Sequence, residues 1–206
     1  MPLPSKTIVR LGKYRKVLMI YKELQSYYIF SHDLATKLRI NPVHIRRDLM
    51  LIGFTGNFRH GYSVADLIHR INEVLLKPQS LPAAIIGMGK SGQFILEQIQ
   101  SSPFCPVYIP VTFDIELANT NRSYSNIPCH NLVEAPAIIQ QNNIRIAILS
   151  TQSFELQEIV DSLIPIGIEN FINCTSEIIN VPKHITLREL NIISLFDELG
   201  YSISHR

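Results

Sequence analysis

The chain has 206 residues, of which 46% are hydrophobic and 17% charged, and its formal net charge is +2. This length can bury one core of average size and a second, smaller one, so we expect two domains. No apolar stretch approaches the roughly 18 residues that a membrane span requires, and lysine and arginine interrupt the first turns of the chain. We therefore expect no membrane span and no signal peptide, and a cytoplasmic location.

The cysteines and histidines do not form a recognisable metal site. The three cysteines are odd in number, widely spaced and without a CxxC pair, and no two of the seven histidines are three or four residues apart. Disulfide frameworks and structural zinc sites use closer, paired residues. We expect neither a disulfide nor a bound metal.

The positive charge is concentrated at the start of the chain. Residues 1–77 hold thirteen Lys and Arg against five Asp and Glu, a balance of +8, whereas residues 78–206 hold six against twelve, a balance of −6. A basic block of this size indicates a polyanionic partner for the first part only, with nucleic acid as the leading candidate. Two prolines and several polar residues over 76–82 mark the expected boundary between the two parts.

Three helices are expected in the basic part. Apolar residues recur at steps of three and four over 8–24, which predicts one face of a helix. A second helix is expected from Ser31, which could cap it, and the pair Asn41-Pro42 is a typical start for a third helix that runs to about Leu51. This order is that of a helix-turn-helix, in which His44, Arg46 and Arg47 could reach a major groove.

The next segment is expected to complete a winged helix. Residues 53–62 contain three glycines and suit a hairpin, and Ser63 could cap a following helix with Asp66 at the capping-box distance. The alternative is a small helical dimerisation module with a solvated basic face. The charge of +8 favours DNA binding.

A glycine-rich loop opens the second part. It follows the apolar strand 83–86 and precedes the helical segment 93–99, so the helix start would face the phosphates of a dinucleotide. Asp114 ends the next strand, 107–113, and lies 22 residues after the last glycine, near the usual distance of the acid that binds a ribose, which favours NAD(H) over its 2′-phosphorylated form. The loop residues are Gly87, Met88, Gly89, Lys90, Ser91 and Gly92.

Further elements predict a parallel sheet with ligands at its carboxyl edge. Residues 144–149 and 170–173 have the pattern of buried strands, separated by a helix over 154–163. Cys174 would then lie near a nicotinamide, or it is an unreactive loop thiol. In the last helix Ile192, Leu195, Phe196 and Leu199 form an apolar stripe, which a second copy or the chain's own sheet could cover.

Along nearly its whole length the sequence resembles the Rex family of redox-sensing transcriptional repressors. The motifs that match are Ile8–Leu11, Val43–Leu49, Gly53–Tyr62, Gly87–Gly92, Phe113-Asp114 and Ile172–Pro182. The resemblance implies an α/β fold class: an N-terminal winged helix-turn-helix domain (1–77), a Rossmann-type doubly wound parallel-sheet domain (78–187) and a C-terminal dimerisation helix (188–206) that is swapped between subunits. It further implies a homodimer that binds double-stranded, inverted-repeat operator DNA when NAD+ dominates and is released by NADH.

The resemblance also implies roles for individual residues. The residues expected to bind DNA are Arg10, Lys16, His44, Arg46, Arg47 and Arg59. The dinucleotide would be held by the six residues of the glycine loop and by Asp114. The switch and the dimer contact would involve Lys16, Asn191 and Ile192. Asn191 stands where the family has an aspartate, and Lys16 stands where it often has the partner arginine, so the charged contact that couples NADH to DNA would be weakened.

Two other functions remain open. The glycine loop and Asp114 also suit an NAD-dependent oxidoreductase, but no His, Tyr-x-x-x-Lys or arginine–carboxylate constellation supplies a general acid and a substrate anchor, so we expect no enzyme. The other alternative is a DNA-binding dimer whose Rossmann domain is structural or senses another nucleotide.

Overall fold

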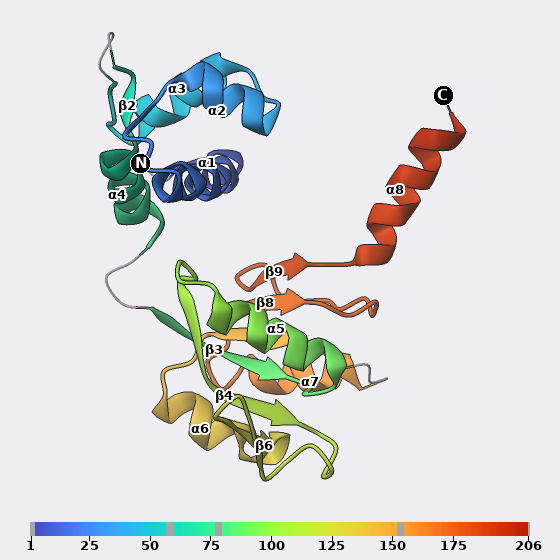
Figure 1. The fold of residues 1–206 in the computed structure, drawn as a ribbon. Coiled ribbons are helices and arrows are strands. Elements are labelled where there is room, and N and C mark those ends of the chain that lie inside the picture. Colours follow the sequence, from blue (N-terminus) through green and yellow to red (C-terminus); the bar gives the residue numbers. More distant parts are fainter. Residues whose placement is uncertain (1–2, 57–59, 77–79, 152–154, 206) are drawn as a thin grey trace. The chain divides into compact units, whose positions relative to one another are not determined.

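The structure, a computed structural model, describes residues 3–56, 60–76, 80–151 and 155–205. Within these ranges the chain divides into two compact units, residues 1–79 and residues 80–206, which are described separately (Figure 1). None of the described helices combines the length and the apolar character that a bilayer crossing needs.

The first unit is a small helical domain. A single buried cluster forms its core, to which α1 contributes Leu11, Tyr14 and Leu18, all fully buried. The spacing of these residues by three and four places them on one helical face, as the sequence predicts. The elements of this unit are α1 (Ser5–Glu23), β1 (Tyr28–Ile29), α2 (Ser31–Leu38), α3 (Pro42–Leu51), β2 (Tyr62–Ser63) and α4 (Val64–Leu75).

Local side-chain bonds fix the starts of these helices. The Asn41 side chain accepts a hydrogen bond from the backbone N–H of Val43 at 2.8 Å, and the Ser63 hydroxyl accepts one from Asp66 at 3.3 Å, which confirms both predicted caps. α2 begins at Ser31 as predicted, but the prediction that Ser31 caps it is wrong, because Ser31 is already helical and Phe30 is the N-cap residue. There the Asp33 carboxylate accepts from the backbone N–H of Phe30 at 3.0 Å, so an acid in the first turn satisfies the N–H that precedes the helix.

The strand pairing beside α4 also differs from the prediction. The sequence predicts a hairpin within 53–62, but β2 pairs antiparallel with β1, with Ile29 opposite Tyr62. The partner strand therefore lies before α2 in the chain, and its two residues are too few to give a readable alternation. Residues 57–59 of the predicted wing, including Arg59, lie outside the described residues.

The second unit contains a seven-stranded sheet with the order β5-β6-β4-β3-β7-β8-β9, in which β5 alone is antiparallel to its neighbour. Its strands are β3 (Leu81–Ile86), β4 (Val107–Asp114), β5 (Arg122–Tyr124), β6 (Ile127–Asn131), β7 (Ile146–Leu149), β8 (Asn170–Asn173) and β9 (Thr186–Glu189). Its helices are α5 (Lys90–Ser101), α6 (Ala135–Gln141), α7 (Leu156–Leu163) and α8 (Ile192–Ser204), with a 3-10 turn at Leu132–Glu134.

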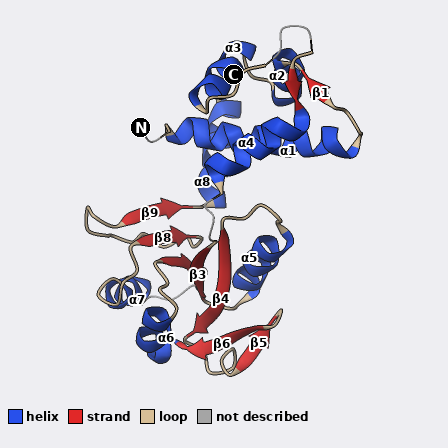
Figure 2. Cartoon of the chain, turned by 90° about the vertical axis from the view of Figure 1, so that its left-hand side faces the viewer, coloured by secondary structure: helices blue, strands red, loops and turns tan. Residues whose placement is uncertain are grey.

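Helices cover both faces of this sheet. Figure 2 shows α5 on one face and α6 and α7 on the other, and each face has its own buried apolar cluster. The arrangement confirms the predicted fold class, an N-terminal helix-turn-helix followed by a doubly wound parallel sheet. The outer strands β5, β6 and β9 were not predicted, because their sequences are polar or contain proline and lack a buried apolar run.

Candidate functional sites

The glycine loop that joins β3 to α5 is built by close backbone contacts. Gly87 has a φ of +99°, and a Cβ added there would lie 2.5 Å from the backbone nitrogen of Thr151. A Cβ on Gly92 would overlap the carbonyl oxygen of Gly87. These two glycines therefore serve the tight turn and the close packing of the helix on the strand.

The middle glycine faces open space. Gly89 is the N-cap residue of α5, and a Cβ added there would meet no atom within 4 Å. It opens onto a pocket of about 380 Å³ at the carboxyl edge of the sheet. The N-terminus of α5 brings free backbone N–H groups and a partial positive charge to this pocket, which fits a pyrophosphate. The pocket is lined by Gly87, Gly89, Lys90, Ser91, Asp114, Glu116, Asn119, Ser150 and Thr151.

Asp114 ties the glycine loop to the end of β4. Its carboxylate accepts hydrogen bonds from the backbone N–H of Met88 at 2.6 Å, from that of Glu116 at 2.8 Å and from the Asn119 amide at 3.1 Å. The residue is only 3% exposed. Three of the four or so acceptor positions of the carboxylate are thus used inside the protein, which leaves about one for a ligand.

Sequence reasoning missed two polar residues of the same pocket, Glu116 and Asn119. Glu116 is exposed, and its carboxylate accepts one hydrogen bond from Asn119 at 3.3 Å. Their position in the sequence could have identified them, because they follow Asp114, the last residue of β4, by two and five residues. A ligand that contacts Asp114 would lie close to both. A second carboxylate here strengthens the case against a 2′-phosphate.

Of the neighbouring residues, Ser150 supports the glycine loop, whereas Cys174 and Phe94 lie outside the pocket lining. Ser150 donates to the carbonyl oxygen of Gly87 at 2.7 Å and so holds the loop against the end of β7. Cys174 does not line this pocket, and burial raises the pKa of its thiol, in keeping with an unreactive residue. Phe94, on α5, is 61% exposed and does not line the pocket.

In the first unit, α3 presents a basic exposed face. His44, Arg46 and Arg47 are all exposed on this helix, and Arg46 donates a hydrogen bond to the Ser31 hydroxyl at 3.2 Å. Lys16 is exposed on α1. The structure therefore leaves these four predicted DNA-binding side chains accessible to a ligand.

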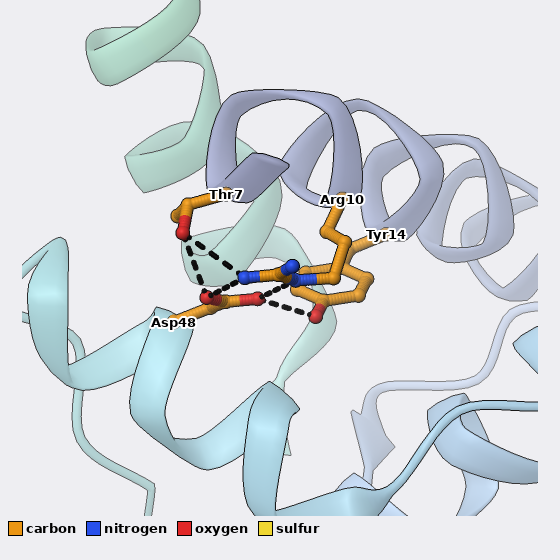
Figure 3. A network of polar contacts seen from close by, with 4 residues as sticks. All are labelled: Thr7, Arg10, Tyr14 and Asp48. Carbon is orange, nitrogen blue, oxygen red and sulfur yellow. Dashed lines mark hydrogen bonds and ion pairs between the residues drawn. The ribbon is translucent and has the colours of Figure 1, made fainter. Parts of the chain in front are cut away.

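Arg10 is different, because it is bound to a buried carboxylate (Figure 3). Its guanidinium donates from Nε to Oδ2 of Asp48 at 2.6 Å and from Nη2 to Oδ1 at 2.8 Å. The Tyr14 hydroxyl donates to Asp48 at 2.7 Å, and the Thr7 hydroxyl donates at 3.1 Å. Asp48 lies on α3 and the other three residues lie on α1, so the network joins the two helices.

The network fixes the charge states of its members. Burial alone would raise the pKa of Asp48, but the hydrogen bonds from Arg10, Tyr14 and Thr7 outweigh it and hold this pKa below its ordinary value. The hydrogen bond to Asp48 raises the pKa of Arg10, and burial raises that of Tyr14. Both shifts favour the charged forms, so the pair is a carboxylate and a guanidinium at neutral pH.

The last helix is capped by one of the predicted switch residues. The Asn191 side chain accepts from the backbone N–H of Ile193 at 2.9 Å, which starts α8. No residue of α8 is buried, and its apolar side chains, Ile192 among them, are more than half exposed. Lys16 and Asn191 lie in different units, so their pairing stays a prediction. Among the described residues no group of three or more His, Cys, Asp or Glu side chains could hold a metal ion.

Comparison with known proteins identifies relatives that span both units. Residues 2–49 match a family described as putative DNA-binding protein N-terminus. A redox-sensing transcriptional repressor Rex from Pediococcus pentosaceus is 27% identical over 197 residues, which are 96% of this chain and 94% of that protein. A protein of the same name from Listeria welshimeri is 25% identical over 203 residues, covering 98% and 94% of the two chains.

Solved structures share the fold. A crystal structure of RSP in complex with β-NAD+ and operator DNA matches with a TM-score of 0.88 and 22% identity, over 100% of this chain and 94% of that one. The structure of RSP with β-NADH matches with a TM-score of 0.83 and 21% identity, over 100% and 96%. Another RSP structure is described as that of a Rex-family repressor. Over nearly its whole length the chain is similar to curated proteins named redox-sensing transcriptional repressor Rex.

Proposed function

We propose that this protein is a transcriptional repressor that binds inverted-repeat operator DNA as a homodimer and is released by NADH. Transcription of its targets would then follow the NADH/NAD+ ratio of the cytoplasm. The observation that supports this most directly is the combination, in one chain, of an exposed basic α3 with a glycine loop that leaves room for a pyrophosphate. The names of its relatives and the ligands of the RSP complexes support the same function.

The DNA site comprises residues of the first unit. Arg46 and Arg47 would reach base edges or phosphates from α3, with His44 beside them, and Lys16 would contribute from α1. Arg59 is proposed as the wing contact from the resemblance alone. Most of the binding free energy would come from neutralised phosphates, so affinity should fall steeply with salt.

The nucleotide site comprises the glycine loop and the carboxylates beside it. The backbone N–H groups at Gly89, Lys90 and Ser91 would hold the pyrophosphate at the start of α5, and Met88 and Gly92 would support the turn. The Lys90 ammonium adds a positive charge beside the phosphates. Asp114 and Glu116 supply acceptors for ribose hydroxyls and disfavour a 2′-phosphate, which makes NADH and NAD+ the expected ligands. The relative occupancy of this site by NADH and NAD+ would then follow the NADH/NAD+ ratio.

A second copy of the chain would cover α8. Its apolar side chains include Ile192 and Phe196, each 64% exposed, and such a row of large apolar groups normally marks an interface. A homodimer also matches the two-fold symmetry of an inverted repeat. We propose a swapped arrangement of α8, as the resemblance implies.

The coupling between the two ligands would be weaker than in relatives that have the charged pair. Asn191 already accepts the capping hydrogen bond of α8 and has no charge with which to hold a cation. A neutral hydrogen bond is roughly half as strong as a charge-assisted one, so NADH would shift DNA affinity by less than the usual 1–3 kcal/mol of allosteric coupling. This observation favours, as a second candidate, a DNA-binding dimer that responds weakly or to another nucleotide.

Catalysis is not part of the proposal. The described residues that line the nucleotide pocket include no histidine, tyrosine or cysteine that could exchange a proton with a substrate. Incubation with NAD+ and a panel of 2-hydroxy acids and aldehydes should produce no NADH absorbance, and turnover of any of them would restore the oxidoreductase hypothesis.

The deciding experiment is fluorescence anisotropy with the full chain and a labelled inverted-repeat duplex. Release by NADH, but not by NAD+, supports the redox repressor. Tight binding that ignores both nucleotides supports the second candidate. Absence of binding to any duplex refutes both.

A further inference from the structure

The first unit contains a pocket that the proposed DNA contacts do not yet explain. It lies between the start of α1 and α3 and has a volume of about 280 Å³. Its charged and titratable lining residues are Lys6, Arg10, His44, Arg47 and Asp48. Below it is called the α1–α3 pocket.

The floor of the α1–α3 pocket is an internally neutralised ion pair. The Asp48 side chain is 2% exposed, and its two oxygens accept four hydrogen bonds, two from Arg10, one from Thr7 and one from Tyr14 (Figure 3). A carboxylate has about four acceptor positions, so Asp48 has none left for another donor. Arg10 donates from Nε and Nη2 to Asp48 and from Nη2 to Thr7, while its side chain stays 28% exposed.

The rim of the pocket, in contrast, is cationic. Lys6, His44 and Arg47 are exposed, and none of the three has a side-chain hydrogen bond or ion pair within the described part of the chain. The first turn of α1 holds no acidic residue that could occupy them. Three donor side chains therefore line the same pocket as an ion pair with no net charge. This pair does not repel an anion, and its carboxylate has no free acceptor position for the three donors.

We propose that the α1–α3 pocket binds one backbone phosphate of DNA through Lys6, His44 and Arg47, and that Arg10 is a positioning residue that does not contact DNA. The inference rests on the proposed function and deepens it. It adds Lys6 to the DNA site and withdraws Arg10 from it.

The geometry explains why the two roles are separated. Lys6 belongs to α1, whereas His44 and Arg47 belong to α3, so a phosphate in the pocket would bridge two helices. The Arg10–Asp48 pair joins the same two helices from below and fixes their spacing. Phosphate contacts of this kind set the register of a recognition helix on the duplex without reading its sequence.

The first test measures the salt dependence of binding for single variants of the full chain. The probe is a labelled 30-base-pair duplex of mixed sequence, because a phosphate contact does not depend on the operator. Lys6→Gln should lower the slope of log affinity against log salt by about 0.9, the value for one lost phosphate contact. Lys22→Gln is the matched control, since it removes an exposed lysine from the opposite end of α1.

The second test separates positioning from contact at Arg10. In Arg10→Met, Asp48 becomes an unpaired anion under the phosphate, and affinity should fall by about tenfold or more. The double variant Arg10→Met/Asp48→Asn removes both charges and should recover most of this loss. The salt slope of the double variant should equal that of the wild type, because no phosphate contact has been removed.

The outcomes distinguish this inference from the proposed function. If the wild type binds DNA but Lys6→Gln keeps the wild-type slope, the phosphate site is refuted and the repressor stands. If the double variant loses one unit of slope and does not recover, Arg10 contacts DNA and its positioning role is refuted. If the wild type binds no duplex, the proposed function and the inference fail together. Circular dichroism melting of each variant verifies that the first unit is folded, and Lys6→Gln, at an exposed position, provides the test even if Arg10→Met unfolds.

Discussion

Each unit of the protein has a buried aspartate beside its proposed ligand site, and the two are satisfied in different ways. Asp48 in the first unit is bonded to a guanidinium and two hydroxyl groups, which neutralise it. Asp114 in the second unit accepts hydrogen bonds only from uncharged N–H groups, those of Met88, Glu116 and Asn119, and no cation among the described residues is paired with it. Asp48 can therefore lie under a DNA phosphate without repelling it. Asp114 can disfavour a nucleotide that has a 2′-phosphate on its ribose.

This comparison assigns different energetic roles to the two acids. A buried ion pair that loses one partner leaves an uncompensated charge or unsatisfied donors, which is costly to stability. An acid that holds a loop through neutral donors contributes less to the fold and more to the shape of the pocket.

Asp48→Asn should destabilise the first unit by about 3 kcal/mol, because the partly exposed Arg10 guanidinium loses its charged partner and the buried hydroxyl groups of Thr7 and Tyr14 lose a charged acceptor. Urea denaturation followed by circular dichroism measures the change, and DNA affinity should fall with it. Asp114→Asn is the comparison variant and should cost stability much less. Equal losses in the two variants would contradict the distinction drawn between the acids.

Gly92→Ala should destabilise the second unit by roughly 2–3 kcal/mol, because its Cβ would collide with the Gly87 carbonyl oxygen and the helix must shift. Gly89→Ala is the matched control, since a Cβ there meets nothing in the protein. It should leave the melting temperature unchanged and weaken NADH binding, measured by calorimetry. Unaltered NADH affinity in Gly89→Ala would argue against a pyrophosphate at this position.

Arg46→Ala should weaken binding to the inverted-repeat duplex by about 1–3 kcal/mol if its side chain makes a bidentate base contact. NADH affinity should not change, because Arg46 belongs to the other unit. Anisotropy with the inverted repeat and with an unrelated duplex distinguishes the possible contacts. An equal loss on both duplexes would identify a phosphate contact instead.

Asp114→Asn should reduce NADH affinity by about 1–2 kcal/mol, because the loop loses a charge-assisted acceptor for the Met88 N–H. It should also narrow the preference for NADH over NADPH, since one of the two negative charges near the ribose is removed. Titration with both nucleotides measures this ratio. A preference that stays the same would assign the discrimination to Glu116.

The Asp48 carboxylate should also make stability depend on pH. Burial would raise the pKa of Asp48, but the hydrogen bonds from Arg10, Tyr14 and Thr7 hold it below its ordinary value in the folded protein. Its contribution to stability is therefore present above about pH 4 and is lost as the pH falls through the folded pKa. Denaturation at several pH values should show the gap between wild type and Asp48→Asn closing below pH 4. A gap that is constant down to pH 2 would indicate that Asp48 is not the ionised partner of Arg10.

The order of the main elements and the place of the nucleotide site could be predicted from local sequence patterns. Asn41 and Ser63 act through hydrogen bonds to residues two and three positions away, and Gly92 packs against the Gly87 carbonyl oxygen five positions away, so these effects can be read locally. The apolar spacing of α1 encodes its buried face, and the apolar runs of β3 and β7 encode strands that are buried on both faces. The resemblance to the Rex family predicted the function, because its motifs lie both in the basic first part of the chain and in the part that contains the glycine loop.

Which charged residues are free to bind a ligand depends on long-range packing that the sequence does not reveal. Arg10 and Asp48 are 38 residues apart, and Met88 and Asp114 are 26 apart, so no local pattern reveals that they are bonded. The same holds for β1 with β2 and for the polar outer strands, whose pairing depends on distant neighbours. The local sequence around a charged residue is the same whether its side chain contacts solvent, a ligand or a buried partner. The contact depends on how distant parts of the chain pack against that residue.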